Sequence, residues 1–333
     1  MRLPLTIRVL LLPLSWIYGA IVRIKTALYG SGVIPQKRLH GAVVSVGNLT
    51  VGGTGKTPMV LWLAENFLAE GKRVAILSRG YRGEQGSSDE VELLKRRLGG
   101  RARFGVGPDR FAEGRKLEQA EPVDVFLLDD GFQHPRLARD VDIVMLDGSK
   151  KLKDEWLLPA GNLREPIRAC RRADLLVVTR KSECPPIEAK DAHEHQLFYA
   201  QTRLLGFRKL GEQGAPHFLR EIGAGPYFAF CGIGNSQGFF GDLQRWHARA
   251  VGTREFRDHH HYSQSDANDL QALAKKVGAT ALVTTEKDEQ NLRGVNFAQL
   301  PVYVAVIDFV LSSESEFRPT LDRILAERRS RVT

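Results

Sequence analysis

The stretch G-N-L-T-V-G-G-T-G-K-T-P, Gly47–Pro58, decides the fold that we expect for this chain. It follows a short apolar run, Ala42–Val46, and precedes a segment whose apolar residues recur at helical spacing until Gly71. A glycine-rich loop between a strand and a helix lets backbone N–H groups converge on phosphate oxygens, and the helix N-terminus adds partial positive charge. The pattern therefore predicts a nucleotide phosphate site, although Thr50 stands where the strict G-x-x-x-x-G-K-[ST] motif has its first glycine.

The end of this loop carries the residues with the most defined roles. The Lys56 ammonium would reach the β- and γ-phosphates, and the Thr57 hydroxyl would bind Mg²⁺. Pro58 is compatible with a helix because it falls in the first turn. The nucleotide-binding candidates are Gly52, Gly53, Thr54, Gly55, Lys56 and Thr57.

A second motif, L-L-D-D-G-F-Q-H, comes directly after the expected strand Val123–Leu128. An acidic residue at the carboxyl end of such a strand is where P-loop enzymes hold Mg²⁺ or its waters. Two adjacent carboxylates repel each other unless a cation lies near them. Asp129 is therefore the first metal-ligand candidate and Asp130 the second, and we count Asp130 and Lys56 among the catalytic residues. His134, in the same loop, is a substrate-binding candidate.

The rest of the chain alternates apolar runs with helical stretches, which is the pattern of parallel sheets covered on both faces. The expected fold is α/β, with a P-loop NTPase-like first domain, a mostly parallel sheet and a smaller second domain. Polar sequence at 181–196 and Gly/Pro-rich sequence at 206–226 interrupt the alternation, so we place the domains at 1–205 and 206–333. Further strands are expected at Val74–Leu77, Val141–Leu146, Leu175–Thr179, Tyr227–Cys231, Ala281–Thr284 and Val302–Val306.

Composition is that of a globular protein: 333 residues are 43% apolar and 26% charged, which suits two domains. The three cysteines have no C-x-x-C spacing, so neither a disulfide framework nor a cysteine zinc site is indicated, and a reducing cytoplasmic compartment fits best.

The N-terminal region is basic and apolar. No Asp or Glu precedes Glu65, and Val9–Val22 is an uncharged run of 14 residues. Spanning a bilayer takes about 20 apolar residues, so this run is too short. Two interpretations remain: an interfacial helix on an anionic membrane, which Trp16 and Tyr18 near basic residues favour, and a buried helix of the first domain.

Three weaker motifs follow. S-R-G-Y-R-G at Ser78–Gly83 offers arginines to phosphate, and L-L-P-A-G-N-L-R-E-P ends near Arg164 and Glu165. The run R-D-H-H-H-Y at Arg257–Tyr262 does not favour zinc, because three consecutive histidines cannot all face one ion from a helix or strand.

Taken in order, these motifs, with F-C-G-I-G-N and L-V-T-T-E-K-D further on, resemble the tetraacyldisaccharide 4′-kinases of Gram-negative lipid A synthesis. The likeness runs from the N-terminal apolar segment to about residue 310. It implies ATP- and Mg²⁺-dependent phosphorylation of the 4′-hydroxyl of a tetraacylated, 1-phosphorylated glucosamine disaccharide at the cytoplasmic face of the inner membrane. It also implies two α/β/α domains, the second closing over an active-site cleft, with the lipid precursor and the anionic membrane surface as partners.

The resemblance also assigns residues. It places the family's lysine and threonine on Lys56 and Thr57, and its paired acids and histidine on Asp129, Asp130 and His134. The family's catalytic aspartate lies in a G-D-E-P motif that this chain does not keep; S-D-E-V at Ser88–Val91 matches best and makes Asp89 the candidate base, with Asp109 second. Its histidine partner falls on His259, with His260 and His261 as alternatives. The substrate-binding candidates are His134, Arg164, Glu165, Arg79 and Tyr81.

Two other classes compete with this interpretation. A P-loop GTPase or ATPase switch without a lipid acceptor would share Lys56, Thr57 and Asp129, but Thr285–Asp288 lacks the N-K-x-D spacing of a guanine reader. A nucleic-acid-binding module would suit the net charge of +9, but no recognised binding motif supports it. No obligate protein partner is indicated, and the sequence assigns no role to Glu286, Lys287 or Asp288.

Overall fold

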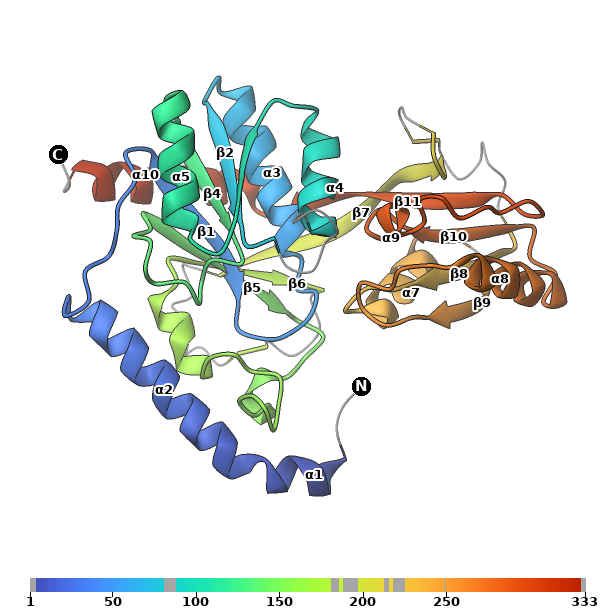
Figure 1. Ribbon diagram of the computed structural model, residues 1–333, viewed down its shortest axis with the longest axis horizontal. Coiled ribbons are helices and arrows are strands. Elements are labelled where there is room, and N and C mark those ends of the chain that lie inside the picture. The colour runs from blue at the N-terminus through green and yellow to red at the C-terminus, as the bar shows by residue number, and fades with distance from the viewer. Residues whose placement is uncertain are drawn as a thin grey trace. The chain divides into compact units, whose positions relative to one another are not determined.

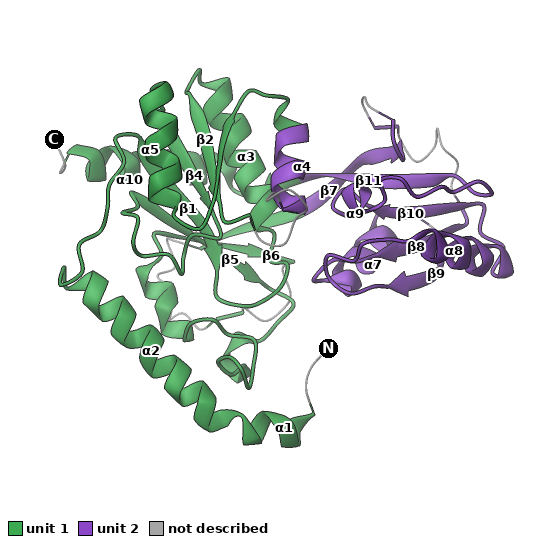
Figure 2. Ribbon diagram, viewed as in Figure 1, with its two compact units in different colours: residues 1–82, 97–201, 309–333 green, residues 83–96, 202–308 purple. Residues whose placement is uncertain are grey.

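The computed structural model describes residues 4–80, 88–180, 186–187, 197–212, 216–217, 225–248 and 250–330. The chain forms two compact units, coloured separately in Figure 2. Unit 1 contains residues 1–82, 97–201 and 309–333, and unit 2 contains residues 83–96 and 202–308.

Unit 1 carries the glycine-rich loop. Its elements, labelled in Figure 1, are α1 (Leu5–Leu10), α2 (Leu12–Gly30), β1 (Ala42–Asn48), α3 (Lys56–Ala69), β2 (Val74–Ser78), β3 (Arg103–Val106), α5 (Arg110–Ala120), β4 (Val125–Asp129), β5 (Val141–Asp147), the 3₁₀ segments η2 (Leu152–Asp154) and η3 (Ile167–Arg172), β6 (Leu175–Thr179), the start of β7 (Leu197–Lys209) and α10 (Glu314–Ser330).

The sheet of unit 1 has the strand order β3-β2-β4-β1-β5-β6-β7, and every neighbouring pair in it is parallel. Strands β1, β2, β4, β5 and β6 are buried along their whole length, which explains their continuous Val/Ile/Leu runs. Because β1 lies between β4 and β5, the loop after β1 comes next to the loop after β4. The two loops that carry the candidate nucleotide and metal residues therefore lie next to each other in unit 1.

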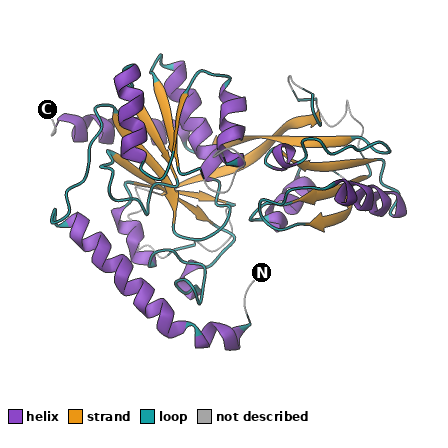
Figure 3. Ribbon diagram, viewed as in Figure 1, coloured by secondary structure: helices purple, strands orange, loops and turns teal. Residues whose placement is uncertain are grey.

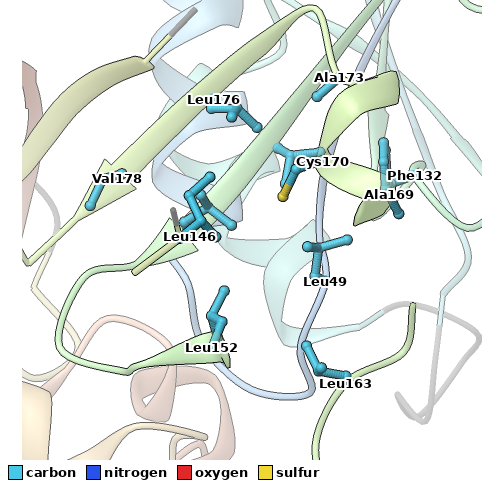
Figure 4. Packing of buried hydrophobic residues seen from close by; sticks show 12 residues of the cluster. Leu49, Phe132, Leu146, Leu152, Leu163, Ala169, Cys170, Ala173, Leu176 and Val178 are labelled. Carbon is cyan, nitrogen blue, oxygen red and sulfur yellow. The ribbon is translucent and has the colours of Figure 1, made fainter. Parts of the chain in front are cut away.

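Helices cover both faces of this sheet, as the colouring by secondary structure in Figure 3 lets the reader follow. On one face, Leu49, Phe132 and Cys170 pack with side chains of β5 and β6 in the cluster shown in Figure 4. Phe198 pairs in register with Val177, so it points to the opposite face from Leu176 and Val178 of that cluster. The Phe198 ring meets Phe317 of α10 at 5.0 Å, and Phe317 meets Trp62 of α3 at 5.7 Å. Helices α3 and α10 therefore lie on the opposite face, which gives an α/β/α layering.

Unit 2 repeats this layering with its own core. It holds most of α4 (Asp89–Leu98), the end of β7, β8 (Tyr227–Cys231), α7 (Ser236–Arg245), β9 (Ala250–Glu255), α8 (Gln264–Lys276), β10 (Ala281–Thr285), α9 (Asp288–Asn291) and most of β11 (Val302–Leu311), with strand order β7-β11-β10-β8-β9. Alternate residues of β8 face opposite sides: Ala229 packs with Phe239 of α7, whereas Phe230 packs with Leu270 of α8.

All eight expected strands are confirmed, as β1, β2, β4, β5, β6, β8, β10 and β11, although β4 begins at Val125 and not at Val123. The predicted division at 205/206 needs correction. The chain crosses between units inside β7, at 201/202, and returns to unit 1 inside β11, at 308/309. Residues 83–96 also belong to unit 2, which the sequence did not indicate because the helix following Ser88 reads as one more helix of the first domain.

The apolar N-terminal segment forms two consecutive helices, not a buried core helix. In α1 no residue is buried, and in α2 only Ser15 and Gly19 are. Across the described residues, none of the helices has the length and apolar character needed to cross a membrane.

Candidate active site

The glycine-rich loop is held in place from two sides of unit 1. The Asn48 amide, at the end of β1, donates to the Gly52 carbonyl at 3.3 Å and to the Thr54 hydroxyl at 3.1 Å. From the end of β6, the Thr179 hydroxyl donates to the Thr54 carbonyl at 3.2 Å. Gly55 has φ of 88°, in the left-handed region, and a Cβ there would come within 3.1 Å of Thr179. A glycine is therefore required where the loop enters α3.

Lys56 and Thr57 open α3, as the motif predicts, and Thr57 is buried. Val46 pairs in register with Asp129, so the carboxyl end of β4 lies next to the loop and Asp129 is buried there. Asp129 thus lies at the end of the strand next to β1, the strand that leads into the loop before Thr57. Asp129 and Thr57 both offer hard oxygen ligands of the kind that Mg²⁺ prefers. Among the described residues, no group of three or more His, Cys, Asp or Glu side chains could hold a metal by itself.

Asp130 lies at the centre of a cluster of charges. Its φ is 53°, so it turns out of β4 in the left-handed region. The Lys56 ammonium lies 3.5 Å from Oδ1, and Arg164 Nη1 donates to Oδ1 and Oδ2 at 2.9 and 2.7 Å. Burial alone would raise the pKa of Asp130, but the Lys56 and Arg164 charges outweigh it and hold the pKa below its usual value. Asp130 is therefore an anion that aligns Lys56 and Arg164.

His134 is half-buried and lies near cations. Burial, followed by the charges of Arg110, Lys25 and Arg139, lowers its pKa to about 4, so its ring is neutral at pH 7. Its Nε2 atom is buried and has no hydrogen-bond partner within the described part of the chain. A neutral ring of this kind can donate to or accept from a ligand.

Arg110 is a site residue that sequence reasoning missed. It is 6% exposed, and its burial, followed by the charge of Arg79, lowers its pKa, whereas Asp130 and Asp129 raise it. A buried guanidinium beside both acids is suited to phosphate. The signal in the sequence was G-P-D-R at Gly107–Arg110, which led only to Asp109 as the second candidate for the base.

Asp109 has a structural role in unit 1. Its side chain accepts from the Ala112 N–H at 3.2 Å as the N-cap of α5, and it pairs with Arg136 at 3.3 Å. These bonds already use both carboxylate oxygens, which weakens its candidacy as the base.

Glu165 has different contacts from Arg164, its neighbour in the L-R-E-P sequence. It is 3% exposed, accepts from the Gln133 amide at 3.2 Å and pairs with Arg172 at 2.9 Å. Burial raises its pKa, and Arg172 partly offsets that effect. Within the described residues, the geometry makes Glu165 a support for the Gln133 loop, while Arg164 faces Asp130. Arg79 follows β2 directly, and Tyr81 lies outside the described residues.

Unit 2 brings together Asp89 and His259, which are 170 positions apart in sequence, at 2.9 Å between Oδ2 and Nδ1. Asp89 opens α4, and the Asn291 amide donates to the same oxygen at 2.9 Å. Burial would raise the pKa of Asp89, but the hydrogen bonds from His259 and Asn291 outweigh it and hold it below its usual value. The bond to Asp89 likewise raises the pKa of His259. The pair is therefore an ionised carboxylate supported by a histidine.

The three consecutive histidines take different partners. His259 has φ of 58° and its backbone N–H donates to the Gly232 carbonyl at 2.9 Å, which turns the ring toward Asp89. The His260 ring stacks on Phe256 at 4.6 Å and lies 3.2 Å from Asp266. His261 is exposed. Of the three, His259 is the one placed on the candidate base.

Comparison with known proteins agrees with the ordered motifs. Residues 7–326 match the family model described as Tetraacyldisaccharide-1-P 4'-kinase. The tetraacyldisaccharide 4'-kinase of Geobacter metallireducens is 37% identical, over 95% of this chain and 98% of the relative, and that of Pseudomonas paraeruginosa is 35% identical, over 95% and 94%. A crystal structure of LpxK from Aquifex aeolicus, described as an apo form in complex with ATP, is 31% identical and superposes with a TM-score of 0.75 over 96% of this chain and 99% of that one. The chain belongs to the tetraacyldisaccharide 4'-kinase family.

Proposed function

We propose which residues of this chain transfer the γ-phosphoryl group of ATP to the 4′-hydroxyl of tetraacyldisaccharide 1-phosphate. Family membership, with the match over residues 7–326, carries the reaction itself. The details below concern which residues perform it. The hydroxyl oxygen forms a bond to the γ-phosphorus, the bond to the bridging oxygen breaks, ADP leaves, and the hydroxyl proton needs an acceptor.

The loop of unit 1 is suited to ATP and Mg²⁺. Backbone N–H groups of Gly52–Gly55 and the start of α3 favour phosphate, and the relative from Aquifex aeolicus was crystallised with ATP. Thr57 and Asp129 would hold Mg²⁺, and two protein oxygens suit an ion that usually shares its remaining positions with water and substrate phosphates. Bound there, the ion would neutralise charge on the β- and γ-phosphates.

Cations of unit 1 would stabilise the transferring group. Lys56 is aligned by Asp130, which also holds Arg164, and Arg110 supplies a third positive charge near these acids. Because the charge of a phosphoryl group is spread over its equatorial oxygens in transfer, fixed cations stabilise the transition state. His134, neutral at pH 7, is available for a hydrogen bond with the lipid substrate.

Asp89 would accept the proton. It is ionised, its Oδ2 is held by His259 and Asn291, and Oδ1 is the oxygen that we assign to the sugar hydroxyl. We assign His259 the task of orienting this carboxylate, which is the role that the ordered motifs implied.

The N-terminal helices would bind the membrane. Leu10, Leu14, Ile17, Ile21 and Ile24 follow each other at helical spacing, and each is more than half exposed. Such a contiguous apolar surface indicates an interaction site.

The opposite side of these helices faces the rest of unit 1 through polar contacts. The Ser15 hydroxyl donates to the Leu157 carbonyl at 3.0 Å, and the Tyr18 hydroxyl donates to the Arg164 carbonyl at 2.9 Å. An apolar stripe turned outward, with Arg23 and Lys25 exposed beside it, suits an interfacial helix on anionic lipid. We place the protein at the cytoplasmic face of the inner membrane, where the acylated substrate would be.

Activity is tested with γ-labelled ATP, Mg²⁺ and the tetraacyldisaccharide 1-phosphate in detergent micelles. The proposal expects label in the lipid. Labelled inorganic phosphate with no labelled lipid would instead indicate a nucleotide switch without an acceptor.

Membrane binding is tested by flotation with vesicles that contain phosphatidylglycerol. Replacing Ile17, Ile21 and Ile24 with serine should abolish flotation, whereas Val277→Ser, which removes an exposed apolar residue of unit 2, should not. Equal flotation of both variants would contradict the membrane assignment.

A further inference from the structure

The short helix α9 contacts the start of α4 through residues of the T-T-E-K-D segment and its continuation. The Asn291 amide donates to Asp89 Oδ2 at 2.9 Å, and Lys287 Nζ donates to Glu90 Oε1 at 2.8 Å. Lys287, with burial acting against it, lowers the pKa of Glu90 to about 2, so this is an ion pair. Both contacts lie within unit 2 and join segments about 200 positions apart in sequence.

A third contact lies nearly two turns of helix further along α4, at Arg96. Arg208 and Arg96 both donate to the Glu289 carboxylate, with Arg208 Nη1 at 2.8 Å from Oε1. Glu289 is 8% exposed, and Arg208 is equally buried. Buried charges of opposite sign in such contact resist separation, because removing one leaves the other unpaired. The contact therefore fixes α9 against α4 independently of Asn291.

Asp288 anchors α9 to the loop that carries His259. Its Oδ1 accepts from the Gly232 N–H at 2.7 Å and from the Tyr262 hydroxyl at 2.8 Å, and its Oδ2 accepts from the Thr285 hydroxyl at 2.6 Å. Gly232 in turn holds the His259 backbone. The same segment thus controls both the carboxylate and the histidine that orients it.

We propose that Asn291 is a positioning residue for the Asp89 carboxylate, with the Thr285–Asn291 segment as the platform that holds it. Its amide and the His259 ring both bind Oδ2, which restricts rotation of the carboxylate and reserves Oδ1 for the acceptor hydroxyl. The inference rests on the proposed role of Asp89 as the base. It gives a task to residues for which the sequence motif alone suggested none.

The pKa of Asp89 provides a specific readout of the role of Asn291. The titratable and charged groups that face it or its partners are His259, His261, Asp258, Glu90 and Lys287. Asn291 adds an uncharged donor that stabilises the ionised carboxylate more than the protonated acid. Its removal should raise the pKa of Asp89, because the ionised form loses a hydrogen bond, while the charged groups remain.

The test compares Asn291→Ala and Asn291→Asp with Asn268→Ala, an exposed asparagine of α8 that serves as the matched control. Rates are measured from pH 3 to 8 with saturating lipid, so that the acid limb of the unaltered chain falls inside the range, and thermal melting checks the fold. Asn291→Ala should lower kcat roughly tenfold, a part of the 10²–10⁴ that a general base supplies, with KM for ATP unchanged. The acid limb of its kcat profile should move to higher pH.

Asn291→Asp keeps the side-chain volume, so it carries the test if Asn291→Ala does not fold. Its second carboxylate should move the acid limb further up in pH than the alanine does. Asn268→Ala should match the unaltered chain. An unshifted acid limb in the folded Asn291 variants would overturn the inference, even if kcat fell. Full activity of Asp89→Ala would instead refute the proposed base, which keeps the two failures distinguishable.

Discussion

Removing Asp89 and His259 separately and together tests whether they act as one unit. General bases contribute roughly 10²–10⁴-fold, so we expect Asp89→Ala to lower kcat about 10³-fold, or about 4 kcal/mol. His259 supplies one of two hydrogen bonds to Oδ2, and its side chain is 40% exposed, so solvent weakens its contribution. His259→Ala should therefore cost only about tenfold, since a hydrogen bond to a charged group is worth about 1.5–3 kcal/mol at most.

The double variant distinguishes joint action of Asp89 and His259 from independent action. If both residues act through the Asp89 carboxylate, the double variant should lose about 10³-fold, like Asp89→Ala alone. Independent roles would multiply to about 10⁴-fold. The assay is initial-rate transfer of label from γ-labelled ATP to the lipid, with thermal melting as the check on folding. Multiplicative losses, or a large loss in Asp109→Ala with none in Asp89→Ala, would refute the pairing.

Three further predictions concern charge. Lys56→Ala should lower kcat by roughly 10²–10³ with unchanged circular dichroism, because a fixed charge at the transferring phosphoryl group is lost; near-normal turnover would contradict this role. Asp129→Asn should raise the Mg²⁺ concentration for half-maximal rate about tenfold or more, whereas Asp154→Asn, at an exposed position, should not; identical titrations would exclude Asp129 as a ligand. The Asp89–His259 pair should stabilise the fold mainly between the ordinary pKa values of 3.8 and 6.5. The depressed pKa of Asp89 gives stability that is lost as pH falls, and the raised pKa of His259 gives stability that is lost as pH rises, so the melting temperature of His259→Ala should differ more from that of the unaltered chain at pH 5.5 than at pH 9.

Much of unit 1 could be predicted from local pattern. Buried parallel strands read as continuous apolar runs, and the glycine-rich loop is recognisable because backbone phosphate binding restricts its residue types. The pairing of Val46 with Asp129 follows once β1 and β4 are recognised as parallel neighbours, because their carboxyl ends then meet. The sequence alone was therefore enough to nominate Thr57 and Asp129 as metal ligands.

The missed strands lack that pattern. Strand β9 runs along the edge of the unit 2 sheet as A-V-G-T-R-E with no buried residue, and β3 is only four residues long. Strand β7 spans 13 residues with mixed burial, because it passes from one unit to the other. An exposed or crossing strand has no single apolar face from which to infer it.

Contacts between segments far apart in the sequence also could not be predicted from local sequence patterns. The likeness to the family suggested Asp89 and His259, but nothing in the spacing placed Asn291 on the same oxygen. Arg110 reads as an ordinary first-turn residue of a helix, and only the folded chain shows that its guanidinium is buried beside Asp129 and Asp130.

The position of the transferred phosphate tests the central claim most directly. Purified protein is incubated with ATP, Mg²⁺ and tetraacyldisaccharide 1-phosphate, and the lipid product is examined by mass spectrometry and ³¹P NMR. The account predicts a single added phosphate on the 4′-oxygen of the disaccharide, formed far more slowly in a parallel reaction with Lys56→Ala. A lipid recovered without added phosphate, or phosphorylated at another hydroxyl, would contradict it.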